Sequence, residues 1–334
     1  MSVWKYIARR LLFMIPMFIG ISVMVFLIMY ATGDPIQLIV RGNPRLLTNP
    51  QVLGEIKAYY GLDKPLPEQY LIWLWKFVNL DLGKSVIGGR PVNVLVGSWI
   101  FETIKLQLVA LVLSLTASIF IGILSARKQY SKTDYAVTTT ALFGISMPVF
   151  WFGIILILVF SFKLGWLPSA GAYGATRIWP SLKPIGEANT IEIFVDSIYH
   201  LILPALVLTF ANLALYVRII RATMLEILRQ DYVLAARASG LPERKVIYSH
   251  GFRNALSPLV TLVGLYFGAI IAGAPITETV FSWPGLGRFY VQATLILDFP
   301  VVMGITMIIV LMTLVANLIT DLTYAVIDPR IRVE

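Results

Sequence analysis

The sequence predicts an all-α integral membrane protein with six transmembrane helices. Hydrophobic residues make up 58% of the 334-residue chain and charged residues only 13%, whereas an ordinary soluble domain has about 25% charged residues. Six stretches lack Lys, Arg, Asp and Glu over enough length to cross the hydrocarbon core, which takes about 20 helical residues. They are residues 11–33, 106–126, 135–162, 197–217, 254–277 and 299–320. These stretches are too long and too uniformly apolar for the strands of a membrane barrel.

Clusters of basic residues predict the orientation. They precede the first stretch, follow the second and fill the segment after the fourth, residues 218–253. Cytoplasmic loops carry the excess of Lys and Arg, so these segments and both termini are expected in the cytoplasm. The net charge of +9 then reflects topology, and no nucleic-acid partner is needed to explain it. The clusters are Lys5, Arg9 and Arg10, then Arg127, Lys128 and Lys132, then seven residues within 218–253.

The first stretch is expected to remain as an uncleaved signal anchor, because it lacks the short apolar core and the small-residue cleavage site of a secretory peptide. An external region, residues 34–101, follows it. Within this region, Leu71, Leu74, Trp75 and Val78 recur at steps of three and four residues, which predicts an amphipathic helix over 69–80 lying against the outer membrane face. The sequence leaves open whether it caps the bundle or contacts an external partner.

No catalytic or metal centre is expected. Gly83-Lys84-Ser85 is not a phosphate-binding loop, because Val78 stands where the first glycine is required. The chain has no Gly-x-Ser-x-Gly elbow, no His-Glu-x-x-His pair and no cysteine, and its two histidines, His200 and His250, lie on opposite sides of the predicted membrane. Ionisable groups are absent from the middle of the spans, which disfavours an ion-coupled carrier.

Several residues within the spans point to packing. Gly264 and Gly268 lie four residues apart, a spacing that permits close helix approach, although a moving gate is an open alternative. Pro275 is expected to end or kink the fifth span, and Met147-Pro148 to kink the third. For Asp321, near the inner end of the last span and four residues after Asn317, we expect an interhelical hydrogen bond.

The segment 231–242 predicts a short helix at the cytoplasmic face. It begins at Asp231, contains mainly alanines and other small residues, and is stopped by Gly240 and Pro242, as expected for a helix C-terminus. Ala235, Ala236 and Ala238 would allow a partner to approach closely.

This segment resembles the coupling loop of ABC-importer permeases, in particular the first permease subunit of the dipeptide, oligopeptide and nickel family. The resemblance covers the whole chain, in motif order and on the predicted sides of the spans. Leu234 departs from it, because it stands where the general loop has glutamate, and the distance from Gly240 to Pro258 is longer than usual. The matching motifs are Gly33-Asp34-Pro35, Gly61–Pro65, Asp81–Ser85, Leu164–Ser169, His200–Ala205, Asp231-Tyr232, Ala236–Leu241, Arg253–Pro258, Thr277–Arg288 and Asp328–Arg332.

The resemblance implies a single permease domain over 1–334 with the type I importer fold, in a prokaryotic cell membrane. Its implied partners are a second homologous permease, two cytoplasmic ATP-binding subunits, an extracytoplasmic solute-binding protein and membrane lipid. The ATPases would bind ATP and Mg, leaving this chain without a cofactor. The implied ATPase-coupling residues are Asp231, Ala235, Ala236, Arg237, Gly240 and Leu241. Those implied for the external gate or path are Glu278, Phe281 and Trp283.

Two other classes remain open from the sequence. An ion-coupled secondary carrier would respond to an ion gradient without ATPases, and a membrane-embedded hydrolase would turn over alone. Members resembling this chain take dipeptides, longer peptides, nickel complexes or oligosaccharides, and we expect peptides.

Overall fold

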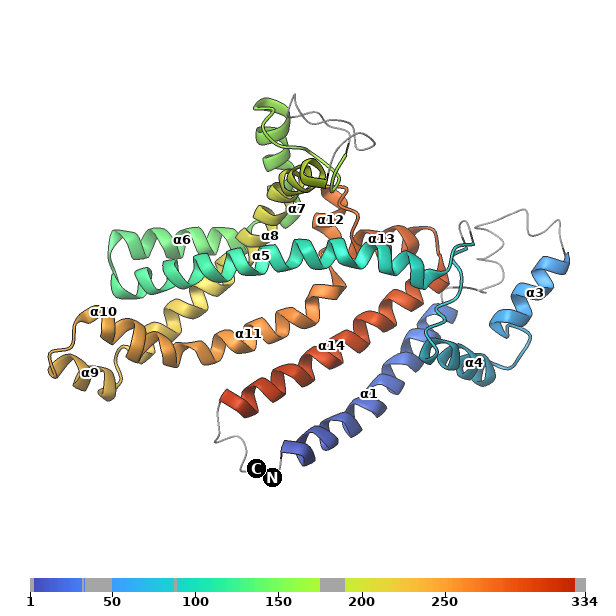
Figure 1. The fold of residues 1–334 in the computed structure, drawn as a ribbon, viewed down its shortest axis with the longest axis horizontal. Helices are drawn as coiled ribbons and strands as arrows, with labels where there is room; N and C mark the ends of the chain where they lie inside the picture. The colour runs from blue at the N-terminus through green and yellow to red at the C-terminus, as the bar shows by residue number, and fades with distance from the viewer. Residues whose placement is uncertain (1–2, 32, 34–49, 87–88, 175–189, 328–334) are drawn as a thin grey trace. The chain divides into compact units, whose positions relative to one another are not determined.

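The computed structural model describes residues 3–31, 33, 50–86, 89–174 and 190–327 (Figure 1). In these ranges the only β-pairing is one isolated bridge between Lys84 and Pro91, so the predicted all-α class is confirmed there. The motif residues Asp34-Pro35 and 328–332 lie outside the described residues. The helices are α1 (Val3–Ala31), α3 (Pro50–Tyr60), α4 (Leu66–Val78), α5 (Val92–Arg127), α6 (Lys132–Ser146), α7 (Val149–Leu156), α8 (Thr190–Ile227), α9 (Asp231–Ala238), α10 (Glu243–Lys245), α11 (Arg253–Ala272), α12 (Pro275–Val280), α13 (Leu286–Leu295) and α14 (Phe299–Ile327), with π-helical segments η2 (Ile157–Lys163) and η3 (Val246–Phe252).

The described helices provide four to six candidate membrane spans. Four helices are long and apolar enough alone, namely residues Ile7–Ala31, Val92–Arg127, Thr190–Ile227 and Phe299–Leu322. Two pairs of helices, each bent at a short break, bring the number of candidate spans to six if each pair is counted as one span. They are Lys132–Ser146 with Val149–Lys163, and Glu243–Leu256 with Pro258–Ala272.

The third predicted span is not one continuous helix. Its two halves meet at 103°, a far larger change of direction than the kink expected at Met147-Pro148. Proline disfavours the helical conformation of the residue before it, and Met147 accordingly has an extended backbone, with φ −79° and ψ 127°. Pro148 then precedes the first residue of α7. The break therefore has a local covalent cause.

The chain divides into two compact units. Unit 1 contains Met1–Thr103, Phe267–Pro275 and Pro284–Glu334, and unit 2 contains Ile104–Tyr266 and Ile276–Trp283. Helices α5 and α11 each contribute residues to both units.

In unit 1, α1 packs beside α14 and also against α4 (Figure 1). Aromatic side chains fill the contact with α4, where Phe26 lies 5.8 Å from Trp73 between ring centroids and Phe18 lies 5.9 Å from Phe77. Arg10 of α1 pairs with Asp321 of α14 at 3.1 Å. The expected interhelical contact of Asp321 is present, but its partner is Arg10.

Helix α4 begins and ends close to the predicted bounds, 69–80. The predicted apolar stripe is largely exposed, with Leu71, Trp75 and Val78 each at least 60% accessible. The opposite side carries the buried Gln69 and Phe77. An exposed apolar stripe suits the predicted position at the membrane face, and that position remains a prediction.

The motif Asp81–Ser85 joins the end of α3 to the start of α14 in unit 1. The Tyr59 hydroxyl donates to Asp81 Oδ2 at 2.7 Å, and the Lys84 backbone N–H donates to the Tyr60 hydroxyl at 3.1 Å. Ser85 Oγ donates to the buried carboxylate of Asp298. Burial is the main cause that raises the pKa of Tyr60 to about 12. The glycine-lysine-serine sequence is therefore part of a structural hydrogen-bond network.

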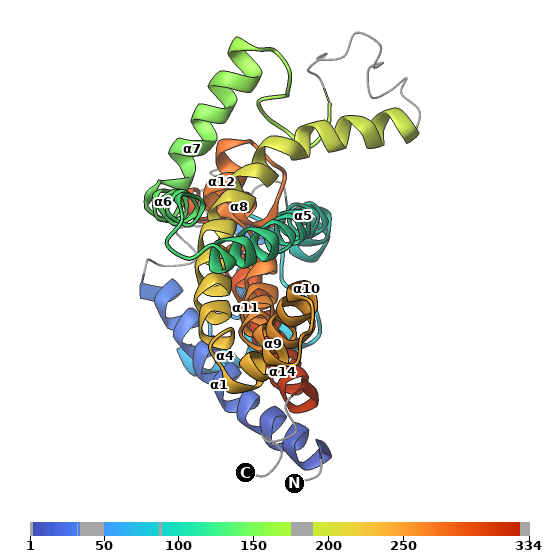
Figure 2. The same ribbon diagram turned by 90° about the vertical axis from the view of Figure 1, so that its left-hand side faces the viewer.

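In unit 2, α8 packs along α6 and α7 (Figure 2). Gly122 of α5 allows close approach to α8, because a Cβ at this position would lie 2.8 Å from Ile220 Cγ2. An apolar cluster of α5, α8, η3 and α11 surrounds this point, made of Ile123, Ala126, Ile220, Met224, Ile247, Ala255 and Leu259.

Candidate functional site

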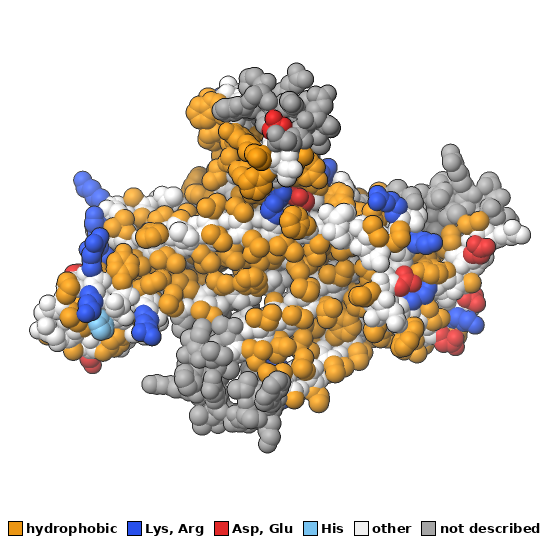
Figure 3. All heavy atoms as spheres, in the orientation of Figure 1, with side chains coloured by type: hydrophobic (Ala, Val, Ile, Leu, Met, Phe, Trp, Pro, Cys, Tyr) orange, Lys and Arg blue, Asp and Glu red, His pale blue; other side chains and the backbone are white. Residues whose placement is uncertain are grey.

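The charged segment 218–253 is mostly helical. Helix α8 continues to Ile227, so the segment expected to begin as a loop at Arg218 leaves the helix about ten residues later. Val217, Ile220 and Met224 are all buried at helical spacing, and this apolar stripe explains why the helix extends through a basic sequence. Basic side chains gather around α9 and α10, beyond the C-terminal end of this helix (Figure 3).

Helix α9 runs from Asp231 to Ala238, within one residue of the predicted end at Ser239, and has two distinct sides. Val233 is fully buried and anchors the helix against the rest of unit 2, where α9 contacts η3. Asp231, Leu234, Ala235 and Ala238 are all exposed and follow one another at steps of three, one and three residues, which places them on one helix face. The outward face thus combines one carboxylate, one leucine and two alanines.

The C-terminus of α9 is a tight left-handed turn at Gly240. The φ of Gly240 is +76°, a region that residues with a Cβ rarely adopt. Its N–H donates to the Arg237 carbonyl at 3.0 Å, and the Ser239 hydroxyl donates to the Ala235 carbonyl at 2.9 Å. This matches the conformation expected for a glycine after a helix.

Arg237 has an acidic partner within the same chain. Its Nη2 donates to Glu243 Oε1 at 2.9 Å and its Nε donates to Glu243 Oε2 at 3.2 Å. A third contact, 3.5 Å long, reaches the Leu228 carbonyl. The guanidinium therefore joins the residues before α9 to those after it and braces the short helix.

A second brace joins α9 to the start of α11. Asn254 Nδ2 donates to the Tyr232 hydroxyl at 2.8 Å and to the His250 carbonyl at 3.0 Å. Ala236 and Leu241, two of the predicted coupling residues, are half-buried. Two of the predicted coupling residues, Asp231 and Ala235, thus lie on the outward face of α9. The exposed Arg237 and Gly240 brace and end the helix, and the half-buried Ala236 and Leu241 lie beside them.

Sequence reasoning missed three contributors to this site. Leu234, treated only as a departure from the family pattern, lies on the exposed face, and its position three residues after Asp231 and four before Ala238 could have shown this. Glu243 and Asn254 bind Arg237 and Tyr232 of α9 only because the chain folds back after the turn at Gly240. No local sequence signal identifies them as partners of α9.

The external candidates Glu278, Phe281 and Trp283 form a separate buried cluster in unit 2, with accessibilities of 0%, 2% and 0%. Phe281 packs with Leu203 and Val207, and its carbonyl accepts the Gly171 N–H at 2.9 Å. Lys105 Nζ lies 5.0 Å from the centroid of a Trp283 ring. In this conformation the three side chains belong to a packed core and do not line an open mouth.

The described residues contain no group of three or more His, Cys, Asp or Glu side chains arranged to hold a metal ion. His200 is buried and faces Asp196, with its Nδ1 at 2.9 Å from the Asp196 carbonyl.

Comparison with known proteins identifies the family. Residues 118–333 match the model of the binding-protein-dependent transport system inner membrane component, and residues 3–119 match the N-terminal part of such components. The chain belongs to this family. The permease is 41% identical over 328 residues to the oligopeptide transport system permease protein AppB of Bacillus subtilis, with 98% of each chain covered. It is 38% identical over 337 residues to the di/tripeptide permease DppB of Pseudomonas aeruginosa and to the dipeptide permease DppB of Escherichia coli K12, with 98% of each chain covered.

The match over nearly the whole chain agrees with the predicted resemblance. The protein is thus a transmembrane permease subunit of an ABC transporter and an inner membrane component. These comparisons give no support to an ion-coupled carrier or a membrane-embedded hydrolase.

Proposed function

We propose that this permease is one of two similar subunits that enclose a path for short peptides, driven by two cytoplasmic ATPases and supplied by an extracytoplasmic solute-binding protein. The peptide class is supported by the names of the full-length relatives, which are oligopeptide, di/tripeptide and dipeptide permeases. In this proposal the ATPases bind ATP and Mg, and the permease carries no ATPase site.

The outward face of α9 is the observation that carries the coupling role. A leucine and two alanines exposed beside one carboxylate form a small apolar surface among basic side chains, and small side chains allow the close approach needed to enter a groove. The opposite side is fixed by Val233, by Arg237 with Glu243 and by Tyr232 with Asn254. A helix held this firmly passes a displacement on to α8 and α11, whereas a mobile loop would absorb it.

Glu278, Phe281 and Trp283 are proposed as part of the external closure. Their burial in this conformation fits a closed state, in which aromatic side chains exclude water from the end of the path. Opening would then require Phe281 to leave Leu203 and Val207.

A transport assay tests the proposal. The permease, its second permease and the two ATPases are purified together and placed in liposomes with the solute-binding protein and a labelled tripeptide. Uptake should require ATP and every subunit. Uptake or hydrolysis by the purified permease alone would contradict the proposal.

The proposed topology has six spans, each bent pair counting as one, and both termini in the cytoplasm. The cysteine-free sequence allows single cysteines to be labelled selectively in intact cells. Lys64→Cys and Lys163→Cys should react with a membrane-impermeant maleimide, and Lys245→Cys should react only after permeabilisation. Protection of Lys163→Cys in intact cells would show that α6 and α7 do not form one span.

A further inference from the structure

We propose that the ion pair of the buried Asp134 and the half-buried Arg221 is a rigid lock that makes α5, α6 and α8 move as one body when α9 is displaced. This inference rests on the proposed function and assigns positioning residues to it. Arg221 lies in the last two turns of α8, ten residues before α9 begins, and Asp134 lies in the first turn of α6.

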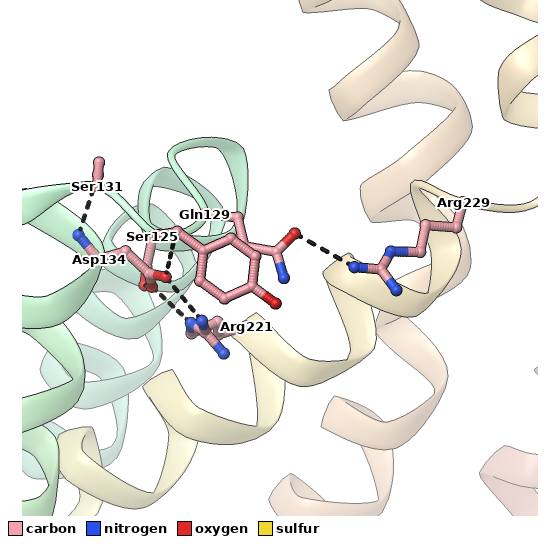
Figure 4. Close-up of polar contacts among 7 residues, drawn as sticks. Ser125, Gln129, Ser131, Asp134, Arg221 and Arg229 are labelled. Carbon is pink, nitrogen blue, oxygen red and sulfur yellow. Dashed lines mark hydrogen bonds and ion pairs between the residues drawn. The ribbon is translucent and has the colours of Figure 1, made fainter.

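The carboxylate of Asp134 receives donors from three separate segments (Figure 4). Arg221 binds it with a two-pronged contact, in which Nε lies 2.6 Å from Oδ1 and Nη2 lies 2.7 Å from Oδ2. Ser125 Oγ in α5 donates to Oδ1 at 2.5 Å, and the Tyr130 N–H donates to Oδ2 at 2.9 Å. One carboxylate thus joins the inner ends of α5, α6 and α8.

The carboxylate of the lock is buried and the guanidinium is half-buried, so the geometry of the pair is hard to change. The Asp134 side chain is 3% exposed and that of Arg221 24%. Two parallel guanidinium–carboxylate bonds fix direction as well as distance, and breaking them would leave a charge without its partner in a poorly solvated site. Apolar contacts between helices allow sliding, whereas this pair fixes the register of α8 against α6.

The lock also connects to the flanks of α9. Residues on either side of Arg221, Ile220 and Met224, belong to the apolar cluster that includes Ile247 of η3 and Ala255 of α11. A Cβ on Gly251 of η3 would lie 3.4 Å from Met224 Cε. Movement of α9 therefore reaches α8 from both sides, and the Asp134–Arg221 pair carries it to α5 and α6.

A nearby contact provides a matched control. Arg229 Nη2 donates to Gln129 Oε1 at 3.3 Å, between the segment after α8 and the turn after α5 (Figure 4). This contact is exposed and consists of one hydrogen bond, so it fixes no direction. Gln129→Ala should leave coupling unchanged.

The test separates a lock from a pair that only stabilises the fold. Asp134→Asn, Arg221→Gln and the double variant are assembled with the partner subunits, and peptide uptake per ATP hydrolysed is measured alongside the yield of assembled complex. Each single variant leaves one charge unpaired, on the buried Asp134 or on the half-buried Arg221, and should lower the yield, while the double variant removes both charges and should restore it. Uptake per ATP should stay at least about fivefold below wild type in all three, because none retains the charge-assisted, two-pronged guanidinium–carboxylate bond.

Recovery of the uptake-to-ATP ratio together with the yield in the double variant would overturn the lock. Where a single variant gives no complex, Arg221→Lys provides the test, since lysine keeps the positive charge but lacks the planar guanidinium that forms two parallel hydrogen bonds. The Arg221→Lys variant should assemble but show less peptide uptake per ATP hydrolysed, and a wild-type ratio of uptake to hydrolysis would count against the lock.

A distance measurement tests the lock without relying on transport. Thr139 of α6 and Leu215 of α8 are exposed, and spin labels on cysteines at these positions report the distance between the two helices. In the assembled wild type, ATP should leave this distance unchanged, and in the double variant it should broaden the distribution. A wild-type distance that shifts with ATP refutes the lock, whereas absence of ATP-driven uptake with a constant distance refutes only the proposed function.

Discussion

Substitution of Gly240 is the sharpest test of the coupling turn after α9. Its backbone adopts φ +76°, and a Cβ built at this position meets no atom within 4 Å. A larger side chain therefore causes no collision, and the whole effect comes from the left-handed backbone, which costs an L-residue about 1–2 kcal/mol. Asparagine tolerates this conformation best, alanine less well and the β-branched valine worst.

The expected loss follows from this cost. If only the left-handed turn presents α9 correctly, about 1 kcal/mol for Gly240→Ala lowers the population of the competent turn roughly fivefold, and about 2 kcal/mol for Gly240→Val lowers it roughly 30-fold. Apparent affinity for the ATPases should fall by the same factors. Gly240→Asn should remain near wild type, and membrane insertion should be normal in all three.

The assay measures ATPase binding, peptide uptake and transport-linked ATP hydrolysis for the reconstituted complex. Gly165 is the matched control, because it has φ +64° and also meets no atom within 4 Å of a built Cβ, yet lies outside the coupling segment. Gly165→Val should carry the same backbone cost without weakening ATPase binding. Wild-type coupling in Gly240→Val, or an equal loss in Gly165→Val, would refute the reasoning.

Three further predictions concern other contacts. Arg237→Ala and Glu243→Ala should weaken ATPase copurification equally, because the pair braces α9. Thermal stability should hardly change, since an exposed pair contributes only about 0.5 kcal/mol. A loss of copurification confined to Arg237→Ala would indicate a direct contact of Arg237 with the ATPase instead. Asp298→Ala should lower the free energy of unfolding by about 2 kcal/mol or more, since it removes a buried carboxylate that accepts a hydrogen bond from Ser85. An unchanged melting temperature would contradict this stabilising role of Asp298. For Tyr60, the folded-state pKa of about 12 lies above the ordinary 10.0. The unfolded chain therefore loses this proton first, and stability falls as the pH rises from about 10 to 12. Tyr60→Phe should flatten this part of a plot of melting temperature against pH, and an unchanged plot would exclude Tyr60 as the cause of the fall.

Local rules were sufficient for much of the coupling segment. Helix formation by small residues, the stop at Gly240 and Pro242, and the need for φ above zero depend on neighbours in the chain. The predicted helix accordingly agrees with α9 to within a residue. The end of α8 was misplaced, because the basic residues after position 217 hid the buried stripe of Val217, Ile220 and Met224.

The sequence by itself determined the all-helical class, the candidate spans and the small helix at Asp231, because these follow from the cost of charge in lipid and from backbone preferences. Met147-Pro148 places the break between α6 and α7, and tertiary structure decided that the bend there reaches 103°. Tertiary structure alone decided that Glu243 pairs with Arg237 and that Arg221 reaches Asp134 across 87 residues. It also decided that Phe281 and Trp283 are core residues in this conformation. The physical reason is that a charged side chain can pair with many oppositely charged groups, and an aromatic side chain can pack against many apolar ones. Only the packing of the helices brings one such partner into contact.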